Sequence, residues 1–184
     1  MANSLSLKIP LPTPMKEASL ETTGNHLNIK YLKLVNHTGS GRKQWSYEYE
    51  KYEKEKYCKG DRFPLHWAMN EDKKKGLSEE EINNILARKE KDANRAVQGD
   101  RILLCQNNYN HGHRVTHVVE TVISTAEKTN EMWTRLVQVI WVAQHPWEKY
   151  APQTKNVIGD FLFKGGNLIS ANAPSIVLNL DALK

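Results

Sequence analysis

The sequence predicts an α+β fold in which a curved, mostly antiparallel sheet or small β-barrel is flanked by one or two helices. Apolar residues gather after residue 97, in short runs that are separated by turn residues. One amphipathic helix precedes these runs, and the chain contains no internal repeat. Short strands at a spacing of roughly ten residues, combined with one or two helices, are typical of a compact α+β domain.

The chain has the length of a single domain, at 184 residues. Residues 1–25 contain three prolines and lack sustained periodicity, so we expect a flexible N-terminal arm without a function of its own. The remaining residues, 26–184, are expected to form one domain. It is long enough to bury a hydrophobic core.

The first strand is predicted over residues 26–35, because apolar and polar residues alternate there. Its buried face is expected to carry Leu27, Ile29, Tyr31 and Val35. A glycine-containing loop follows at 36–45. The charged run at 47–62 fits either a solvated helix or a long exposed hairpin, and its periodicity does not decide between them.

The clearest helix is predicted over residues 76–97. Ser78 can accept a hydrogen bond from the backbone N–H of Glu81, whose carboxylate can reach back to residue 78, which is a capping box. The residues that follow at helical spacing form one face, made of Ile82, Ile85, Leu86, Lys89 and Ala93.

Three longer strands are predicted after the helix, over residues 100–106, 113–123 and 133–143. The last of them has apolar residues on both faces, so we expect it to be covered on both sides. A short strand at 167–170 and a final apolar run at 175–180 close the domain.

The composition favours a polyanionic partner only weakly, with 26 Lys and Arg against 21 Asp and Glu, a net charge of +5 and a pI of about 9.1. Two cysteines give neither a disulfide framework nor a zinc spacing. The N-terminal residues lack the continuous apolar stretch typical of a signal peptide, and no run of ~20 apolar residues occurs. We therefore expect a cytoplasmic protein with reduced thiols and no membrane partner.

Two sites with chemistry can be considered in the strand region. His111, His113 and His117 alternate, so they could present three imidazoles on one face as a metal site. Cys105 with a histidine would be a nucleophile pair, but it lies in an apolar strand where a small core residue is expected. The sequence lacks a nucleophile elbow, a zinc-protease helix motif and glycine-rich phosphate loops. We expect no cofactor and no bound metal.

One stretch resembles a known family. "NNILARKEKDANRAVQGDRILLCQNN", a helix carrying "AR" and a strand of the type "GDRILL", is followed by "RVTHVVETV" and resembles the EVE domain of the PUA-like superfamily. The likeness covers roughly residues 26–181, with "MWTRLVQVIWVAQHPW" similar to its long strand and "FLFKGGNLISANAPSIVLNL" to its closing segment. "THVVE" replaces glycines of the second hairpin strand, and the insertion at 47–62 is unusual for the family.

The resemblance implies a non-enzymatic nucleic-acid-binding module of PUA-like fold. Several members hold a modified base, such as methylated or hydroxymethylated cytosine, flipped into an aromatic-walled pocket. Extracting a base costs a few kcal/mol of stacking, which an aromatic ring can partly restore at about 1–3 kcal/mol per base. DNA is favoured over RNA as the partner, in a restriction or regulatory setting.

The resemblance and the positions of polar residues at strand ends give the candidate site. Trp67 matches the aromatic residue that precedes the family's helix, and Asn70 its polar follower. The full predicted base pocket is Trp45, Trp67, Asn70, Asn36, His37, Gln106 and Asn107. The predicted phosphate contacts are Arg42, Lys43, Lys73, Lys74 and Lys75.

Two alternative functions stay open from the sequence. The first is an enzyme, either metal-dependent through His111, His113 and His117 or a small hydrolase. The second is a protein-interaction module that uses the charged segment at 47–62.

Overall fold

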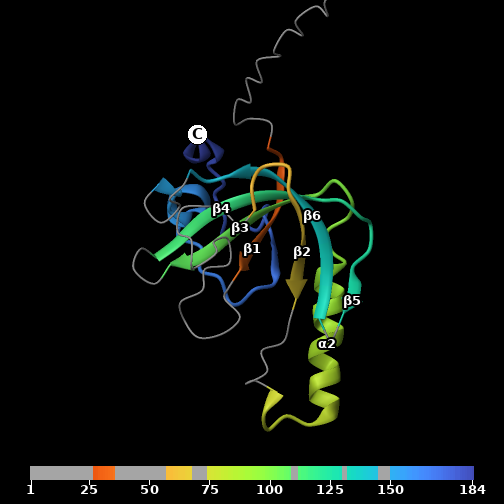
Figure 1. Cartoon of the computed structure of the whole chain (residues 1–184). Helices are drawn as coiled ribbons and strands as arrows, with labels where there is room; N and C mark the ends of the chain where they lie inside the picture. Colours follow the sequence, from red (N-terminus) through yellow and green to blue (C-terminus); the bar gives the residue numbers. More distant parts are fainter. Residues whose placement is uncertain (1–26, 36–56, 68–73, 109–111, 130–131, 145–149) are drawn as a thin grey trace, which may run out of the picture.

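The computed structural model confirms the α+β prediction. Its strands form one curled sheet with the order β2-β6-β4-β3-β1-β7, and β5 pairs with β6 outside this path. Figure 1 shows the strands wrapped into a half-barrel, with α2 projecting past one end of it. The structure describes residues 27–35, 57–67, 74–108, 112–129, 132–144 and 150–184.

The strands of the described chain are β1 (Ile29–Val35), β2 (Arg62–Trp67), β3 (Arg101–Asn108), β4 (Gly112–Thr121), β5 (Glu127–Thr129), β6 (Met132–Val142) and β7 (Leu168–Ser170). The helices are α2 (Glu79–Ala93), α4 (Thr154–Ile158) and the 3-10 turn η2 (Leu180–Leu183). The predicted strands at 100–106, 113–123, 133–143 and 167–170 correspond to β3, β4, β6 and β7.

The sheet is mostly antiparallel, as predicted, with one parallel pair. β1 pairs in parallel with β3, and every other pair is antiparallel. Val35 pairs with Gln106, so the carboxyl ends of β1 and β3 lie at the same edge of the sheet. The loops that follow these two strands therefore leave from neighbouring positions.

The curled sheet carries a hydrophobic core on each face. The inner core includes Tyr31 and Val35 of β1 together with residues of β2, β3, β6 and α2. The outer core includes Leu32 and Leu34 of the same strand, covered by α4 and the C-terminal segment. Because successive residues of a strand point to opposite faces, β1 contributes to both cores.

The predicted single buried face of the first strand is wrong at its beginning. Ile29 and Leu27 pack in the outer core, whereas Tyr31 and Val35 belong to the inner core. The pairing of β1 with β3 shifts register between Ile29 and Tyr31. A bulge of this kind changes the face to which the following side chains point, and sequence alternation does not reveal it.

The capping box predicted for the helix is confirmed at the start of α2. Ser78 is its N-cap, with the Ser78 hydroxyl accepting from the Glu81 N–H and the Glu81 carboxylate accepting from the Ser78 N–H. Only Asp92 and Ala93, in the last turn, are buried. The helix is therefore anchored to the sheet by its C-terminal end.

Of the charged segment at 47–62, for which the sequence left helix and hairpin open, residues 47–56 lie outside the described residues, and β2, which was not predicted, begins at its last residue. Its residues alternate between exposed and buried, and Phe63, Leu65 and Trp67 enter the inner core. In the described part of the chain, no helix has the length and apolar character needed to span a bilayer.

Candidate functional site

A cavity of about 500 Å³ lies between the start of β4 and the α4 region. Its walls come from Gly112 and His113 on one side and from residues 153–155 and 159–162 on the other. Pockets that hold small ligands have volumes of about 300–1,000 Å³. The space is therefore large enough for one nucleobase.

The walls of this cavity are fixed by aromatic contacts. The Phe161 ring packs edge to face on Phe163, with their centroids 5.3 Å apart. The His113 ring packs on the same Phe163 at 6.3 Å, also edge to face. These T-shaped contacts fix the orientations of the Phe161 and His113 rings, and both residues line the cavity.

The polar groups of the cavity are varied. Gln153 is the N-cap residue of α4, but its side chain makes no hydrogen bond to the helix end. Lys155 and Asp160 add an ammonium and a carboxylate, both on exposed residues. A ring, an amide and one charge of each sign can together bind a planar polar heterocycle that carries a sugar or phosphate.

Two glycines shape the turns on either side of the cavity. Gly112 has φ 71° and Gly159 has φ 73°, which L side chains rarely adopt. Val157 and Ile158, which directly precede Gly159 in the chain, are buried in the outer core and attach α4 to the sheet. The loop conformation therefore depends on glycine, and its position depends on apolar burial.

The described members of the predicted base pocket lie elsewhere, inside the inner core. Trp67 is 1% exposed and Gln106 is 0% exposed. The Trp67 indole Nε1–H donates to Asp92 Oδ2 at 2.8 Å, which explains how this large ring can be buried. The sequence places Trp67 on an open wall, whereas the structure uses it to join β2 to α2.

The other predicted pocket residues fall largely outside the described residues. These are Asn36, His37, Trp45 and Asn70. Asn107 belongs to β3, but its side chain is not described. The structure does bring together the carboxyl ends of β1 and β2, the strands that precede Asn36, His37 and Asn70 in the chain. The Lys33 ammonium near the end of β1 lies 4.4 Å from the centroid of the Trp67 ring at the end of β2.

Lys33 is an unusual residue for the inner face of a sheet. It is 3% exposed, and its ammonium also donates to the Gly166 carbonyl. Burial lowers the pKa of Lys33 from 10.5 to about 7, and the nearby Asp92 carboxylate opposes this shift. Lys33 is therefore close to its titration midpoint at neutral pH.

His117 occupies the inner face at the level of Leu104, with which it pairs. Its Nε2–H donates to the Tyr57 carbonyl at 3.0 Å, and Tyr57 in turn stacks on Phe63 at 4.1 Å. Burial lowers the pKa of His117 from 6.5 to about 4. The imidazole is therefore neutral at neutral pH and supports the position of the Tyr57 backbone.

The three histidines do not share one face as the metal hypothesis requires. His113 lines the cavity beside α4, whereas His117 is buried on the inner face. The β3–β4 pairing shifts register between Leu104 and Cys105, which breaks the simple alternation along β4. His111 lies outside the described residues. Within the described residues, no three His, Cys, Asp or Glu side chains gather in a way that could hold a metal ion.

Cys105 has the environment of a core residue, as the sequence indicates. It is buried in the outer core, and burial raises the pKa of its thiol from 9.0 to about 12. Because the thiolate is the nucleophile, this cysteine is poorly suited to covalent catalysis.

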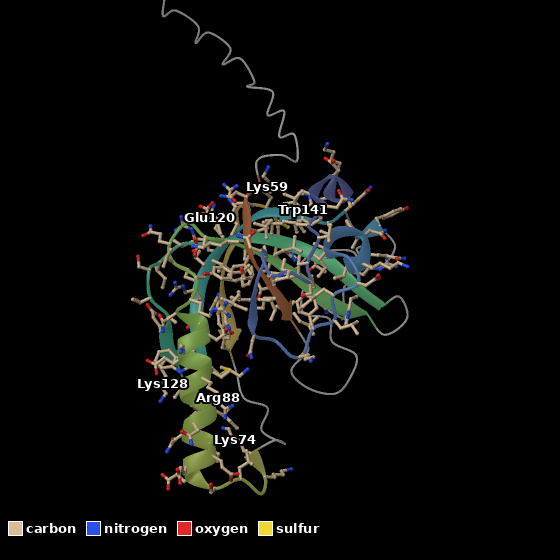
Figure 2. All side chains as sticks on the ribbon, turned by 180° about the vertical axis from the view of Figure 1, so that it is seen from behind. Lys59, Lys74, Arg88, Glu120, Lys128 and Trp141 are labelled. Atoms are coloured by element: carbon tan, nitrogen blue, oxygen red, sulfur yellow. The ribbon has the colours of Figure 1, made fainter. Side chains whose placement is uncertain are left out.

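Two of the predicted phosphate contacts are described. Lys74 and Lys75 precede the N-cap of α2, at the projecting end of the helix (Figure 2). Lys75 is exposed, and Lys74 is half-buried. Arg42, Lys43 and Lys73 lie outside the described residues.

Apart from His113, which was considered only as a metal ligand, no residue of the cavity could be selected from the sequence. Gln153, Asp160 and Phe161 lie in a segment that was assigned only turns and a short element. Pro152 and Gly159 flank α4 and are the one local signal of a shaped loop there. The approach of this segment to the start of β4 depends on tertiary pairing, seen in the bridge between Arg114 and Gln153.

Comparisons of the chain with protein-family models, with curated proteins and with solved structures found no match.

Proposed function

We propose that the protein is a non-enzymatic nucleic-acid-binding module that reads a modified base in DNA, and that the base enters the cavity between β4 and α4. The observation that carries the proposal is the cavity of about 500 Å³, which combines the Phe161 ring with the Gln153 amide. The resemblance of residues 26–181 to the EVE domain supports the same function.

Each wall of the cavity has a matching part in a nucleotide. The Phe161 face stacks on the base, and the Gln153 amide, which can donate and accept, reads its edge. Lys155 contacts a phosphate, and Asp160 accepts hydrogen bonds from an exocyclic amino group or a sugar hydroxyl. Methylated or hydroxymethylated cytosine is the proposed base, because its added group can contact the apolar side of the same pocket.

The charge of the protein supports association with a polyanion. The net charge is +5, and Lys155, which lines the cavity, and Lys164, which follows it in the chain, are both exposed. Cations of this kind give salt-dependent binding without sequence preference, and the pocket would then add discrimination between bases. A cytoplasmic location and a role in restriction or regulation belong to the same proposal.

Fluorescence anisotropy with matched duplexes tests the function. The duplexes are identical except that one cytosine is unmodified, methylated or hydroxymethylated, and an RNA duplex of the same sequence forms a further arm. We expect binding that weakens with salt and that is strongest for one modified DNA duplex. A protein that binds no nucleic acid at low salt, or binds all duplexes equally, would contradict the proposal.

Variants locate the base. Phe161→Leu keeps apolar bulk but removes the ring, and it should weaken binding of the preferred duplex by about 5- to 150-fold, the equivalent of one lost stacking contact. Gln153→Leu should reduce the preference between modified and unmodified DNA. The matched control Lys128→Ala, on β5 beside α2 (Figure 2), should change affinity little. Unchanged binding by Phe161→Leu would refute the cavity as the base site.

A further inference from the structure

The two edges of the half-barrel are joined by side chains in and just after the last turn of α2. Asp92 Oδ2 accepts from the Trp67 indole Nε1–H of β2 at 2.8 Å and from the Leu168 backbone N–H of β7 at 2.8 Å. Arg95 Nη1 donates to the Leu168 carbonyl at 2.7 Å and to Asp92 Oδ1 at 3.3 Å. We call this set of contacts, together with Lys33, the seam.

The seam replaces a strand-to-strand ladder with a few side-chain contacts. Both polar backbone groups of Leu168 bind side chains instead of a neighbouring strand. β7 is only three residues long and pairs with β1 on its other edge. Regions that few hydrogen bonds hold together open at a lower free energy than the rest of a domain. The seam is thus a place where the half-barrel can open locally.

Lys33 is the titratable group inside the seam. Its ammonium lies between the Trp67 ring, at 4.4 Å from the centroid, and the Gly166 carbonyl. Among the described residues, the charged or titratable groups near it are Asp92 and Lys89 of α2, Arg95 in the turn after α2, and Tyr31 of β1. Asp92 attracts the ammonium and Lys89 repels it.

We propose that the seam is a proton-linked latch, in which opening delivers Lys33 to solvent as an ammonium and exposes the Trp67 ring beside it. In the closed seam, burial holds the pKa of Lys33 at about 7, against 10.5 for the exposed side chain. Between these two values the open state binds one more proton than the closed state. Acidification from about pH 10 to about pH 7 therefore favours opening by about tenfold per pH unit. Below about pH 7 both states carry the proton, and the effect no longer grows.

Hydrogen exchange measured by NMR tests the latch on the full chain. The reporters are the indole N–H of Trp67 and the amide of Leu168, and the reference is the amide of Leu103, which lies in β3 between β1 and β4. We expect the two reporters to exchange faster than the reference, which would show that the seam opens without global unfolding. After correction for intrinsic exchange, their protection should rise about tenfold per pH unit above about pH 7.5 and level off below about pH 6.5.

Two variants separate Lys33 from other titrating groups. Lys33→Met keeps a long apolar stem without a charge, and it should remove the pH dependence and raise the protection of both reporters at neutral pH. Lys30→Met is the matched control, since Lys30 is an exposed residue of the same strand that pairs with Asp100. It should keep the wild-type profile. A pH dependence of protection that persists in Lys33→Met overturns the proposal. A wild-type protection that does not change with pH also overturns it, and this measurement does not require Lys33→Met to fold.

Discussion

Asp92→Ala is expected to be among the most damaging single substitutions on α2. The change removes the acceptor of two buried donors, the Trp67 indole N–H and the Leu168 backbone N–H, both at 2.8 Å. Each donor left without a partner costs about 1–3 kcal/mol, so the free energy of unfolding should fall by about 2–6 kcal/mol. A domain of this size typically has about 5–15 kcal/mol in total. The melting temperature should drop by about 10 °C.

Urea unfolding followed by far-UV circular dichroism measures this loss. Asp92→Asn keeps a carbonyl oxygen that can accept, so it should cost only about 1 kcal/mol through the lost charge. The control is Asp181→Ala, because Asp181 is exposed and pairs only with Lys184 among the described residues, and its effect should stay within about 0.5 kcal/mol. If Asp92→Ala unfolds at the same urea concentration as Asp181→Ala, then α2 does not join the two edges of the half-barrel as we describe.

Three further predictions concern burial. The pKa of His117 is about 4 in the fold against 6.5 when exposed, so the unfolded chain binds more protons between these values. About 3 kcal/mol of stability should therefore be lost as the pH falls from 6.5 to 4. Urea titrations at these pH values should show a smaller loss of stability in His117→Gln, and an equal loss would refute His117 as its origin. Cys58 is exposed and Cys105 is buried, so a thiol reagent should label Cys58 alone in the native protein and both cysteines in denaturant, as mass spectrometry can show. In Gly166→Ala the added Cβ would lie 3.1 Å from the Leu34 carbonyl oxygen, which should lower stability by about 1–3 kcal/mol in thermal unfolding. An unchanged melting temperature would show that the segment before β7 can move away from Leu34.

The order of the elements could largely be predicted from the sequence, because local patterns determine it. Ser78 and Glu81 lie at the helix start as their spacing indicates, and the strands after the helix follow the apolar runs. β2 was not predicted, since only three of its six residues are buried and Pro64 interrupts the run. The face assigned to Ile29 was wrong because a register shift within a strand pair leaves no mark in the alternation.

The candidate site was less accessible to sequence reasoning. Tryptophan is a residue type that often forms a pocket wall, but the burial of Trp67 depends on its hydrogen bond to Asp92, which is 25 residues away in the chain. The cavity exists because the segment around Gln153 bridges to Arg114 of β4, a long-range pairing. The polarity of Lys33 within an apolar strand is visible in the sequence, although only the curling of the sheet shows that it faces Trp67.

The position of β1 between β3 and β7 bears on how the protein is made. Of the described strands, β1 is translated before its neighbours β3 and β7, and the residues that pack with Leu32 and Leu34 in the outer core include Ile176 and Leu183. A nascent chain therefore carries β1 without its strand partners until β3 and β7 have been synthesised. Chaperones that bind exposed hydrophobic segments should accordingly associate with this region until β7 is available.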